Sequence, residues 1–407
     1  MSDLVVLGDV AWIDAKLVDP RLSAYSSLPH VSGENIVPVT GELRELRSAA
    51  EDGMESGKYL FSEGHVLYSK LRPYLRKASL VDFSGLCSGD IYPISTDSNR
   101  LSPAYARLLL VSPDFTRFAD EASARSRMPK LNREQLFAYE FALPPLADQR
   151  RIAQELKAQL AVVEEARRAA QALVDESEAL RVAVYRQRFR DVVPVTVPAE
   201  GREDAPEGWR WVKLADVAQL ESGHTPSRAR PDWWGGDVSW VSLTEIRALD
   251  GSWVDATEIR TNEAGIANSS ARILPRGTVC FSRTASVGFV TIMARPMATS
   301  QDFANWVCGD ELDPEFLMYA LIRARKELRA LATGATHKTI YMPMLASFHL
   351  CLPDRATQGK IVQALKAQLA VAEEARRAAQ AQLDEIARLP SRLLAQPFQQ
   401  EEPELCS

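Results

Sequence analysis

The 407-residue sequence has few of the residues that usually build metal sites and disulfide frameworks. Its 5 cysteines are Cys87, Cys280, Cys308, Cys351 and Cys406, an odd and widely scattered set. They form no C-x-x-C pair, and no histidine stands at a metal-ligand spacing from any of them. The sequence therefore predicts neither a zinc site nor a disulfide framework, and no metal ligands are assigned.

Long apolar runs and a leader pattern are also missing. No stretch approaches the roughly 18 apolar residues that a membrane helix requires. The first residues, MSDLVVLGDVAWIDAK, do not combine a basic region, an apolar stretch and a cleavage site. We predict a reduced, cytoplasmic protein that does not associate with a membrane.

The chain has no excess of positive charge. Its 48 Lys and Arg residues face 54 Asp and Glu residues, which gives a formal net charge of -6. This balance argues against a protein that coats nucleic acid through bulk charge, but it leaves a local basic groove possible. With 46% hydrophobic residues, the chain has enough apolar material for two to three folded domains.

Sequence motifs of enzyme chemistry are absent. There is no phosphate-binding loop, dinucleotide-binding fingerprint, nucleophile elbow or amino-methyltransferase signature. Asp148 followed by Glu155 and Lys157 resembles a metal-nuclease set, but Glu155 and Lys157 fall in a predicted helix and a second copy of this segment has Ala364 in place of Glu155. We assign no catalytic residues, and a self-contained nuclease ranks third among the functional hypotheses.

What the sequence does contain is a repeat. Residues 152–172, IAQELKAQLAVVEEARRAAQA, recur as residues 361–381, IVQALKAQLAVAEEARRAAQA, with only three positions changed. The same offset aligns Gln149 with Gln358 and Phe189 with Phe398. The plan is therefore a variable domain followed by a near-identical segment, twice over.

The near-identical segments are predicted to be long helices, because they are rich in Ala, Leu, Glu, Gln, Lys and Arg and contain no Gly. Pro390 is expected to kink or interrupt the second one. A heptad frame gives each helix two seam positions. In the first helix these are Leu156, Val163, Ala170, Ser177 and Val184 at one position, and Ile152, Gln159, Ala166, Leu173 and Leu180 at the other.

Two arrangements of the helices stay open. They can pack against each other antiparallel, or each can be bound into its own domain. The shared EEARRAAQ stretch supplies the candidate partner-binding residues, with a solvated helix face as the simpler interpretation of these charges. The candidates are Glu164, Arg167 and Arg168 in the first copy and Glu373, Arg376 and Arg377 in the second.

The variable segments are predicted to be mixed α/β domains of short strands, a helix and a final strand before a Leu-Pro turn. Short helices are expected within residues 101–110 and 312–322. The predicted division is 1–148 for the first variable domain, 149–190 for the first long helix, 191–205 for a linker, 206–356 for the second variable domain, 357–398 for the second long helix and 399–407 for a tail.

Basic residues gather locally in the first variable domain. Residues 70–77, KLRPYLRK, and residues 125–133, RSRMPKLNR, each hold four cations with hydrogen-bonding side chains between them. Both runs suit contacts with DNA phosphates and bases, and a solvated surface is the equally weighted alternative. The candidate DNA-binding residues are Lys70, Arg72, Tyr74, Arg76, Lys77, Arg125, Arg127 and Lys130.

The corresponding places in the second variable domain are polar and contain glycine. Residues 283–288, RTASVG, and 333–338, TGATHK, supply the candidates Arg283, Thr284, Ser286, Thr336, His337 and Lys338. The Trp-rich residues 231–236, PDWWGG, could form a stacking surface, although buried aromatic packing is the favoured interpretation.

These pieces, in this order and present twice, resemble the specificity subunits of type I restriction-modification systems. The resemblance rests on GHVLYSKLRPYL at 64–75, GTVCFSR at 277–283, GATHK at 334–338 and the helix entry LPPLADQRRI at 143–152. The second helix entry, LPDRATQGKI at 352–361, departs by replacing the second proline. The resemblance covers almost the whole chain.

The resemblance implies a non-catalytic DNA reader of mixed α/β fold, with two target recognition domains separated by two long antiparallel coiled-coil helices. Each domain would read one half of a bipartite target in double-stranded DNA, and the helices would set the spacing. The partners would be two modification subunits that use S-adenosylmethionine and restriction subunits that use ATP and Mg. No cofactor is expected in this chain. The main alternative is a coiled-coil protein-interaction scaffold without sequence-specific DNA binding.

Overall fold

A computed structural model describes residues 3–14, 16–124, 129–197, 204–335 and 337–398. The chain divides into two compact units. Unit 1 comprises Met1–Ala172 together with Ala379–Ser407, and unit 2 comprises Leu173–Ala378. Each unit therefore contains one variable domain and parts of both long helices.

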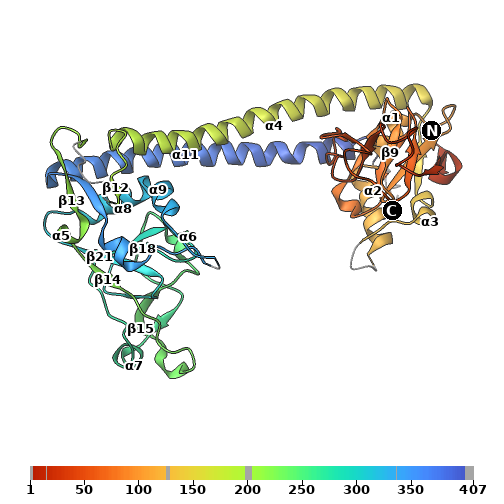
Figure 1. Cartoon of the computed structure of the whole chain (residues 1–407). Coiled ribbons are helices and arrows are strands. Elements are labelled where there is room, and N and C mark those ends of the chain that lie inside the picture. Colours follow the sequence, from red (N-terminus) through yellow and green to blue (C-terminus); the bar gives the residue numbers. More distant parts are fainter. Residues whose placement is uncertain (1–2, 15, 125–128, 198–203, 336, 399–407) are drawn as a thin grey trace, which may run out of the picture. The chain divides into compact units, whose positions relative to one another are not determined.

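In the described residues of unit 1 (Figure 1), the strands form three sheets. Two strands pair antiparallel, β1 (Asp3–Val6) and β11 (Glu140–Leu143). A four-stranded sheet has the order β2 (Ala11–Ile13), β10 (Ile91–Thr96), β7 (Val66–Ser69) and β8 (Ala78–Leu80). A five-stranded sheet has the order β3 (Lys16–Val18), β6 (Lys58–Phe61), β9 (Gly85–Cys87), β4 (Pro29–Val31) and β5 (Arg47–Ser48).

Short helices complete the variable domain of unit 1. They are α1 (Pro103–Leu109), α2 (Pro113–Ser123), α3 (Arg133–Phe137) and the 3-10 turns Leu7–Asp9 and Pro73–Leu75. Proline occupies the first turn of α1 and α2, where its missing N–H costs no helical hydrogen bond. The helix predicted within residues 101–110 is confirmed by α1.

The strands described in unit 2 also form three sheets. One has the order β12 (Val195–Thr196), β22 (His349–Pro353) and β13 (Trp209–Lys213). The central sheet has the order β14 (Ala218–Ser222), β21 (Phe303–Cys308), β18 (Val279–Ser282), β19 (Val290–Met293) and β16 (Trp253–Val254). The third has the order β17 (Arg260–Thr261), β15 (Trp234–Val241) and β20 (Ala298–Thr299).

The helices of the variable domain in unit 2 are short. They are α5 (Leu214–Val217), α6 (Ile246–Leu249), α7 (Glu263–Ala267), α8 (Pro314–Arg323), α9 (Arg325–Ala330), α10 (Met342–Ala346) and the 3-10 turn Pro231–Trp233. The helix predicted within residues 312–322 is confirmed by α8.

The two variable domains share a common scaffold. The strand order β2-β10-β7-β8 of unit 1 recurs as β14-β21-β18-β19 in unit 2, and the β1-β11 pair recurs as β13-β22. The final strand before each Leu-Pro turn is thereby confirmed. The sheets outside this scaffold differ between the units in strand number and order.

The long helices are α4 (Leu146–Arg188) and α11 (Arg355–Ala395). In unit 1, Leu156 and Leu160 near the start of α4 share a core with Leu394 and Phe398 at the end of the second helical segment. In unit 2, Val184 near the end of α4 shares a core with residues of early α11. The helices are therefore antiparallel within each unit, as predicted.

Each helix ends inside the core of the other half's variable domain. Phe189, just after α4, is fully buried in unit 2, with its ring centroid 5.5 Å from that of Phe316. The equivalent Phe398, just after α11, lies 5.2 Å from Tyr105 in unit 1. The alternative in which each helix is bound into its own domain is therefore wrong.

Two details of the helix prediction are corrected. Leu156, Ala170 and Val184 are buried, but Leu173 and Leu180 at the second predicted seam position are each 48% exposed. The buried residues of the second seam position lie one residue later than predicted, at Ala153 and Leu160. The seam of a coiled coil alternates spacings of three and four residues, and either order of these spacings fits the same first seam position. The second seam position was assigned wrongly because the exposed residues Leu173 and Leu180 are apolar.

The second correction concerns Pro390, which does not interrupt α11. Proline removes a single helical N–H donor, and this loss falls close to the end of the helix. Packing holds the turns around it, since Leu394 is fully buried in the core of unit 1 and the Ser391 hydroxyl accepts a hydrogen bond from Arg76.

Candidate nucleic-acid interface

The two basic runs of unit 1 meet at a short backbone junction. Leu71 and Lys130 form an antiparallel bridge, and the Arg72 amide donates to the Pro129 carbonyl at 2.9 Å. The amide of Leu131, which is fully buried, donates to the Lys70 carbonyl at 3.0 Å. The fold therefore brings together two segments that the sequence analysis selected separately. Arg125 and Arg127 lie outside the described residues.

A tyrosine ring organises the cations at this junction. The Lys70 ammonium lies 4.8 Å from the centroid of Tyr92, and the Arg133 guanidinium lies 6.0 Å from it. Burial lowers the pKa of Lys70, and the nearby positive charge of Lys130 lowers it further. The junction of unit 1 is thus a compact positive site. Arg133 belongs to it although it was not among the candidates.

The candidates of unit 1 differ in how far they are already engaged. Lys70 is only 8% exposed and donates to the Gly89 carbonyl, so its side chain holds a turn. Arg76 donates to the Val111 carbonyl and to Ser391, each at 2.7 Å, and Lys77 donates to the Gly33 carbonyl. These three cations stabilise the domain, and their contact with DNA stays a prediction.

The remaining candidates of unit 1 are exposed on a tight turn. Arg72 and Arg76 flank the 3-10 turn Pro73–Leu75 with positive φ angles of 49° and 53°. Non-glycine residues adopt this left-handed conformation at an energetic cost, and such strain is often found at functional sites. The turn leaves the Tyr74 side chain 51% exposed between the two arginines, and Lys130 is exposed nearby.

Unit 2 builds the same junction with different side chains. Thr284 and Thr339 form the bridge, and the amide of the buried Ile340 donates to the Arg283 carbonyl at 2.9 Å. The amide of Ala285 donates to the Lys338 carbonyl at 2.9 Å. Predicted segments 283–288 and 333–338 are therefore also brought together. Thr336 lies outside the described residues.

Arg283 repeats the anchoring contacts of Lys70. Its amide donates to the Asp302 carbonyl at 2.8 Å, just as the Lys70 amide donates to the Asp90 carbonyl at 3.0 Å. Its guanidinium donates to the Gln301 carbonyl at 2.7 Å, and burial lowers its pKa. The aligned cation therefore holds the same turn in both units.

The other candidates at the unit 2 junction are more accessible than Arg283. His337 and Lys338 are exposed, and Thr284 and Ser286 are half-buried. The exposed surface of this junction therefore presents hydroxyl, imidazole and ammonium groups, whereas that of unit 1 presents guanidinium, phenol and ammonium groups.

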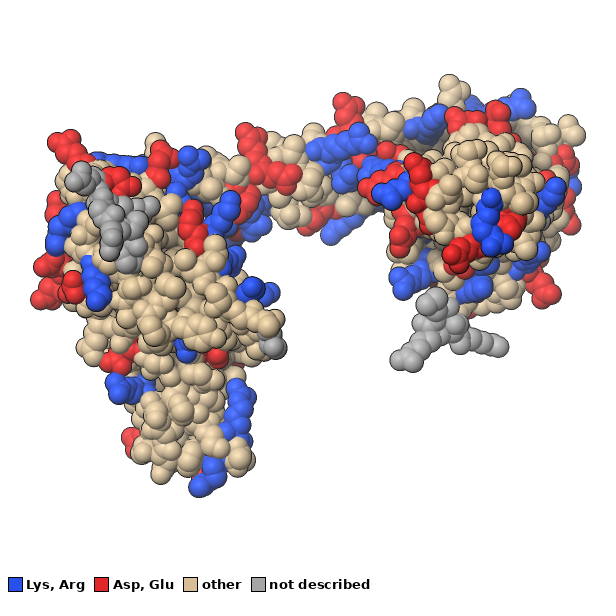
Figure 2. All heavy atoms as spheres, in the orientation of Figure 1, with Lys and Arg blue, Asp and Glu red and all other residues tan. Residues whose placement is uncertain are grey.

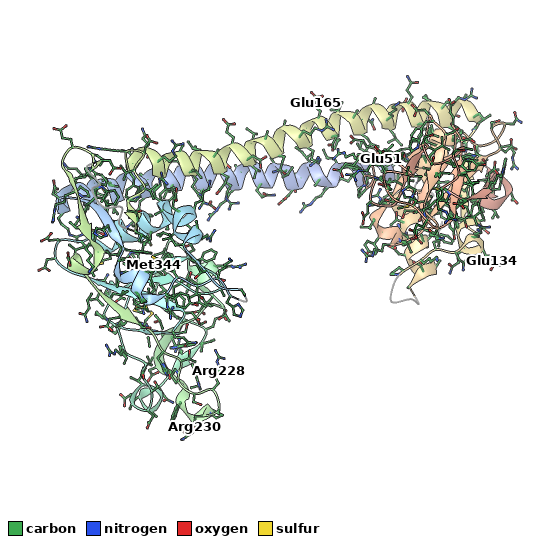
Figure 3. All side chains as sticks on the ribbon, viewed as in Figure 1. Glu51, Glu134, Glu165, Arg228, Arg230 and Met344 are labelled. Atoms are coloured by element: carbon green, nitrogen blue, oxygen red, sulfur yellow. The ribbon has the colours of Figure 1, made fainter. Side chains whose placement is uncertain are left out.

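A second group of cations in unit 2 was not among the candidates. Arg228 and Arg230 lie in the lobe that carries β15 and α7 (Figure 3). The Arg228 guanidinium lies 5.5 Å from the centroid of Trp234, and that of Arg230 lies 4.9 Å from Trp233. Figure 2 shows Lys and Arg side chains along the margins of this lobe, with few carboxylates between them.

The tryptophans of the Trp-rich segment lie in this lobe. Trp233 and Trp234 are half-buried, so each ring packs in part, and their role as a stacking surface stays a prediction. Trp240 is fully buried and packs edge-to-face with Trp234 at 5.0 Å. Arg228 and Arg230 lie in the loop that precedes these tryptophans. In the sequence, arginines alternate with small residues just before the two tryptophans, and this pattern could have identified both arginines.

The duplicated helix segments keep the same ion pairs in both copies. Glu164 accepts from Arg167 at 2.8 Å and from Arg168 at 3.1 Å, and Glu373 accepts from Arg376 at 2.9 Å and from Arg377 at 3.0 Å. Hydrogen bonds from the first arginine of each set lower the pKa of both glutamates to about 2. An exposed apolar side chain lies near each set in the sequence. These side chains are Val162 and Val371, and both are 66% exposed.

The nuclease-like carboxylates are engaged within α4. Arg151 lies 3.1 Å from Glu155 and 3.5 Å from Asp148. Across the described residues, no group of three or more His, Cys, Asp or Glu side chains is placed to hold a metal ion. Within the same residues, no helix combines the length and apolar character needed to cross a membrane.

Comparisons with known proteins agree with this architecture. Residues 206–382 match the family model of the type I restriction modification DNA specificity domain. The chain is 32% identical over 148 residues to the type I restriction enzyme EcoDI specificity subunit of Escherichia coli, which covers 36% of this chain and 32% of that subunit. It is 27% identical over 163 residues to the MjaIX specificity subunit of Methanocaldococcus jannaschii, covering 39% and 38%. The matches thus span about a third of the length of these curated relatives.

Two solved structures share the fold over nearly the whole chain. One, described as the structural basis of complex assembly and conformational transition of the type I R-M system, superposes with a TM-score of 0.78 at 21% identity, covering 96% of each chain. The other is the crystal structure of the HsdS subunit from Thermoanaerobacter tengcongensis, with a TM-score of 0.57 at 21% identity, covering 97% of this chain and 96% of that one. The predicted resemblance to type I specificity subunits and the predicted fold class are confirmed.

Proposed function

From the type I restriction modification DNA specificity domain at residues 206–382, we propose that this chain is the DNA sequence-recognition subunit of a type I restriction-modification complex. One observation carries the proposal for the chain as a whole. The same backbone junction is built twice, with hydrogen bonds from Leu131 to Lys70 and from Ile340 to Arg283, but it carries different exposed side chains in each unit. A shared scaffold with different readers suits recognition of two different half-sites.

The chemistry of the junctions suits double-stranded DNA. Arginine and lysine neutralise phosphates and can also bind guanine edges, whereas Ser, Thr and Tyr mostly donate hydrogen bonds to phosphates and bases. Exposed candidates of these kinds lie at both junctions, namely Arg72, Tyr74 and Lys130 in unit 1 and His337 and Lys338 in unit 2. Each unit would then read one half of a bipartite target.

The helices would bind the partner subunits and set the spacing between half-sites. Glu164 with its two arginines and Glu373 with its two arginines present the same surface twice, each beside an exposed valine. Two equal surfaces suit two copies of one partner, which we propose to be the modification subunits. In such a complex the modification subunits use S-adenosylmethionine, the restriction subunits use ATP and Mg, and this chain is non-catalytic and acts in the cytoplasm.

The recognition role is tested by mapping methylated adenines in cells that express the complex with variant chains. Arg72→Ala with Lys130→Ala should relax or abolish recognition of one half-site, and His337→Ala with Lys338→Ala should affect the other, at about 1–3 kcal/mol per lost base contact. Arg21→Ala is a matched control, because this exposed arginine of unit 1 is paired with Asp19 away from the junction. Unchanged methylation with both double variants would refute the proposed interface.

The spacing role needs a separate experiment. Inserting one heptad into both α4 and α11 should change the preferred gap between the half-sites, because each heptad lengthens a helix by about 10 Å. An unchanged gap in the methylation map would exclude the helices as the element that sets the spacing.

The equal surfaces on the helices also suit a scaffold that binds only proteins. This second candidate function predicts that the complex with modification partners binds DNA without sequence dependence. Sequence-dependent binding would exclude it.

A further inference from the structure

Three arginines of unit 2 converge on one aromatic ring outside the junction. The guanidinium carbons of Arg247, Arg325 and Arg329 lie 5.8, 5.4 and 5.2 Å from the ring centroid of Phe289. Arg247 comes from α6, and the other two are one turn apart on α9. We call these three residues the arginine patch.

The charge of the arginine patch is only partly neutralised. One guanidinium nitrogen of Arg325 donates to both carboxylate oxygens of Asp250, at 2.7 and 2.8 Å. Arg247 and Arg329 have no carboxylate within ion-pair distance among the residues that the structure describes. Burial lowers the pKa of Arg329, the charges of Arg325 and Arg247 lower it further, and the carboxylate of Asp250 opposes this shift. Like charges held this close favour the binding of an anion.

The patch is continuous with the reading junction of unit 2. Arg329 donates to the Val287 carbonyl at 2.8 Å, and Val287 directly follows the 283–286 turn. The next residue is Gly288, with φ +95°, where an added Cβ would lie 3.0 Å from the Arg325 side chain and 3.2 Å from Arg329 Nε. Only glycine adopts this conformation without strain while leaving room for both arginines.

We infer that the arginine patch binds a phosphate of the DNA backbone beside the half-site that unit 2 reads, an inference that rests on the proposed function. A planar guanidinium offers paired N–H donors that match phosphate oxygens. Phosphate contacts fix the register of a protein on the duplex, whereas base contacts read the sequence. Because the patch adjoins the turn at 283–288, an anchored phosphate would position that turn against the base edges.

Among the described residues of unit 1, no arginine cluster around a ring lies at the corresponding place. In unit 1, α2 follows α1 as α9 follows α8, but α2 begins Pro113–Asp114, and its Arg117 pairs with Asp114 at 2.7 Å. The phosphate contact is therefore inferred for unit 2 only.

The test measures how duplex binding by the full-length chain, with modification subunits supplied, depends on salt. The probe is a random-sequence DNA duplex. Each phosphate contact contributes about 0.9 to the slope of log Kobs against log salt, so losing the one inferred phosphate contact in Arg247→Gln with Arg329→Gln should reduce the slope by about 1. The affinity should fall by the same factor for random DNA and for target DNA, because the lost contacts do not read bases.

Two further variants control this measurement. Arg276→Gln removes another arginine of unit 2 that stacks on an aromatic ring, with its guanidinium 5.4 Å from Trp253 and away from the patch, and it should leave the slope unchanged. Arg329→Lys keeps the charge and should retain most of the slope. Thermal unfolding of each variant checks that unit 2 stays folded.

The possible results separate the inference from the proposed function. An unchanged slope in the double variant, or an equal loss in Arg276→Gln, would overturn the arginine patch and leave DNA recognition standing. A loss confined to target DNA would make the patch a base reader and would also overturn the inference. If the wild-type complex binds no duplex, both the proposed function and the inference fail. Loss of modification-subunit binding with an unchanged slope would assign the patch to an acidic protein partner instead.

Discussion

The two units build the same backbone junction with different side chains. At unit 1, Lys70 and Arg133 lie around Tyr92, and Arg72 and Arg76 flank a strained turn. At unit 2, the corresponding turn is polar, and the cations lie around Phe289 and Trp234 instead. The comparison teaches that the backbone junction is the constant element, whereas positive charge can be placed on different neighbouring elements of each unit.

The largest expected effect concerns a contact that both units share. The buried Gln149 donates to the Arg100 and Pro144 carbonyls and accepts from the Ser102 amide, and Gln358 makes the same three bonds to Glu311, Pro353 and Asp313. Gln149→Ala and Gln358→Ala should each lower the free energy of unfolding by about 3 kcal/mol, because buried polar groups lose their partners. Denaturant unfolding measures the loss.

The exposed Gln159 on α4 provides the control for this pair of variants, and Gln159→Ala should change stability by less than about 0.5 kcal/mol. Clearly unequal losses for Gln149→Ala and Gln358→Ala would break the equivalence of the two helix entries.

A smaller effect sharpens the difference between the units. Arg228→Ala should weaken DNA binding by about 2 kcal/mol, and only at the half-site read by unit 2, because its guanidinium has no carboxylate partner among the described residues. Arg230→Ala is the matched control, since this arginine is already paired with Asp232 at 2.7 Å. Equal losses in both variants, measured by equilibrium binding, would argue against a specific role for Arg228.

Tyr92 tests the organisation of unit 1 alone. Its hydroxyl donates to the Leu131 carbonyl at 3.3 Å and so helps to hold the junction. Tyr92→Phe should lower the stability of unit 1 by about 1 kcal/mol, because the carbonyl loses a partner while the ring that supports Lys70 and Arg133 remains. Unfolding monitored by hydrogen exchange should show the change in unit 1 only. The exposed Tyr74→Phe should have almost no effect.

The smallest effect is a dependence on pH that the two helix copies should share. The pKa values of Glu164 and Glu373 are lowered to about 2 in the folded chain, against about 4.3 for an unperturbed glutamate. Their contribution is therefore present above pH 4.3 and is lost as the pH falls toward 2. These pairs are partly exposed, so we expect only about 0.5 kcal/mol for each glutamate.

Glu164→Gln and Glu373→Gln should each flatten the pH dependence of the unfolding free energy in this window. Glu165→Gln is the control, because Glu165 points outward from α4 (Figure 3) and forms no ion pair within the described part of the chain. A change as large in the Glu165→Gln variant would attribute the dependence to general surface charge.

Periodic and repeated features could be predicted well from the sequence. The duplicated segment identified α4 and α11, and the aligned Phe189 and Phe398 occupy equivalent places in the two cores. The seam was displaced by one residue because Leu173 and Leu180 are apolar but exposed. Hydrophobicity alone cannot decide which of two adjacent heptad positions faces the partner.

The site was predictable only in part. The fold brings the basic and polar runs together in pairs, and their contact with DNA stays a prediction. The sequence could not show that the side chains of Lys70 and Arg283 donate to backbone carbonyls. In a sequence, a cation that holds a turn cannot be distinguished from one that faces solvent. The sequence could not show the arginine patch either, since Arg247 and Arg329 are far apart in the chain and meet only through Phe289.

The placement of Phe189 and Phe398 has a consequence for the order in which the protein can fold during synthesis. Unit 1 contains the first variable domain, but Leu394 and Phe398 complete its core. That core cannot close until nearly the whole chain has left the ribosome, whereas unit 2 is contiguous in sequence and has all of its parts earlier. The domain made first should therefore be the last to reach its final packing, and during that interval its exposed apolar surface is prone to aggregation.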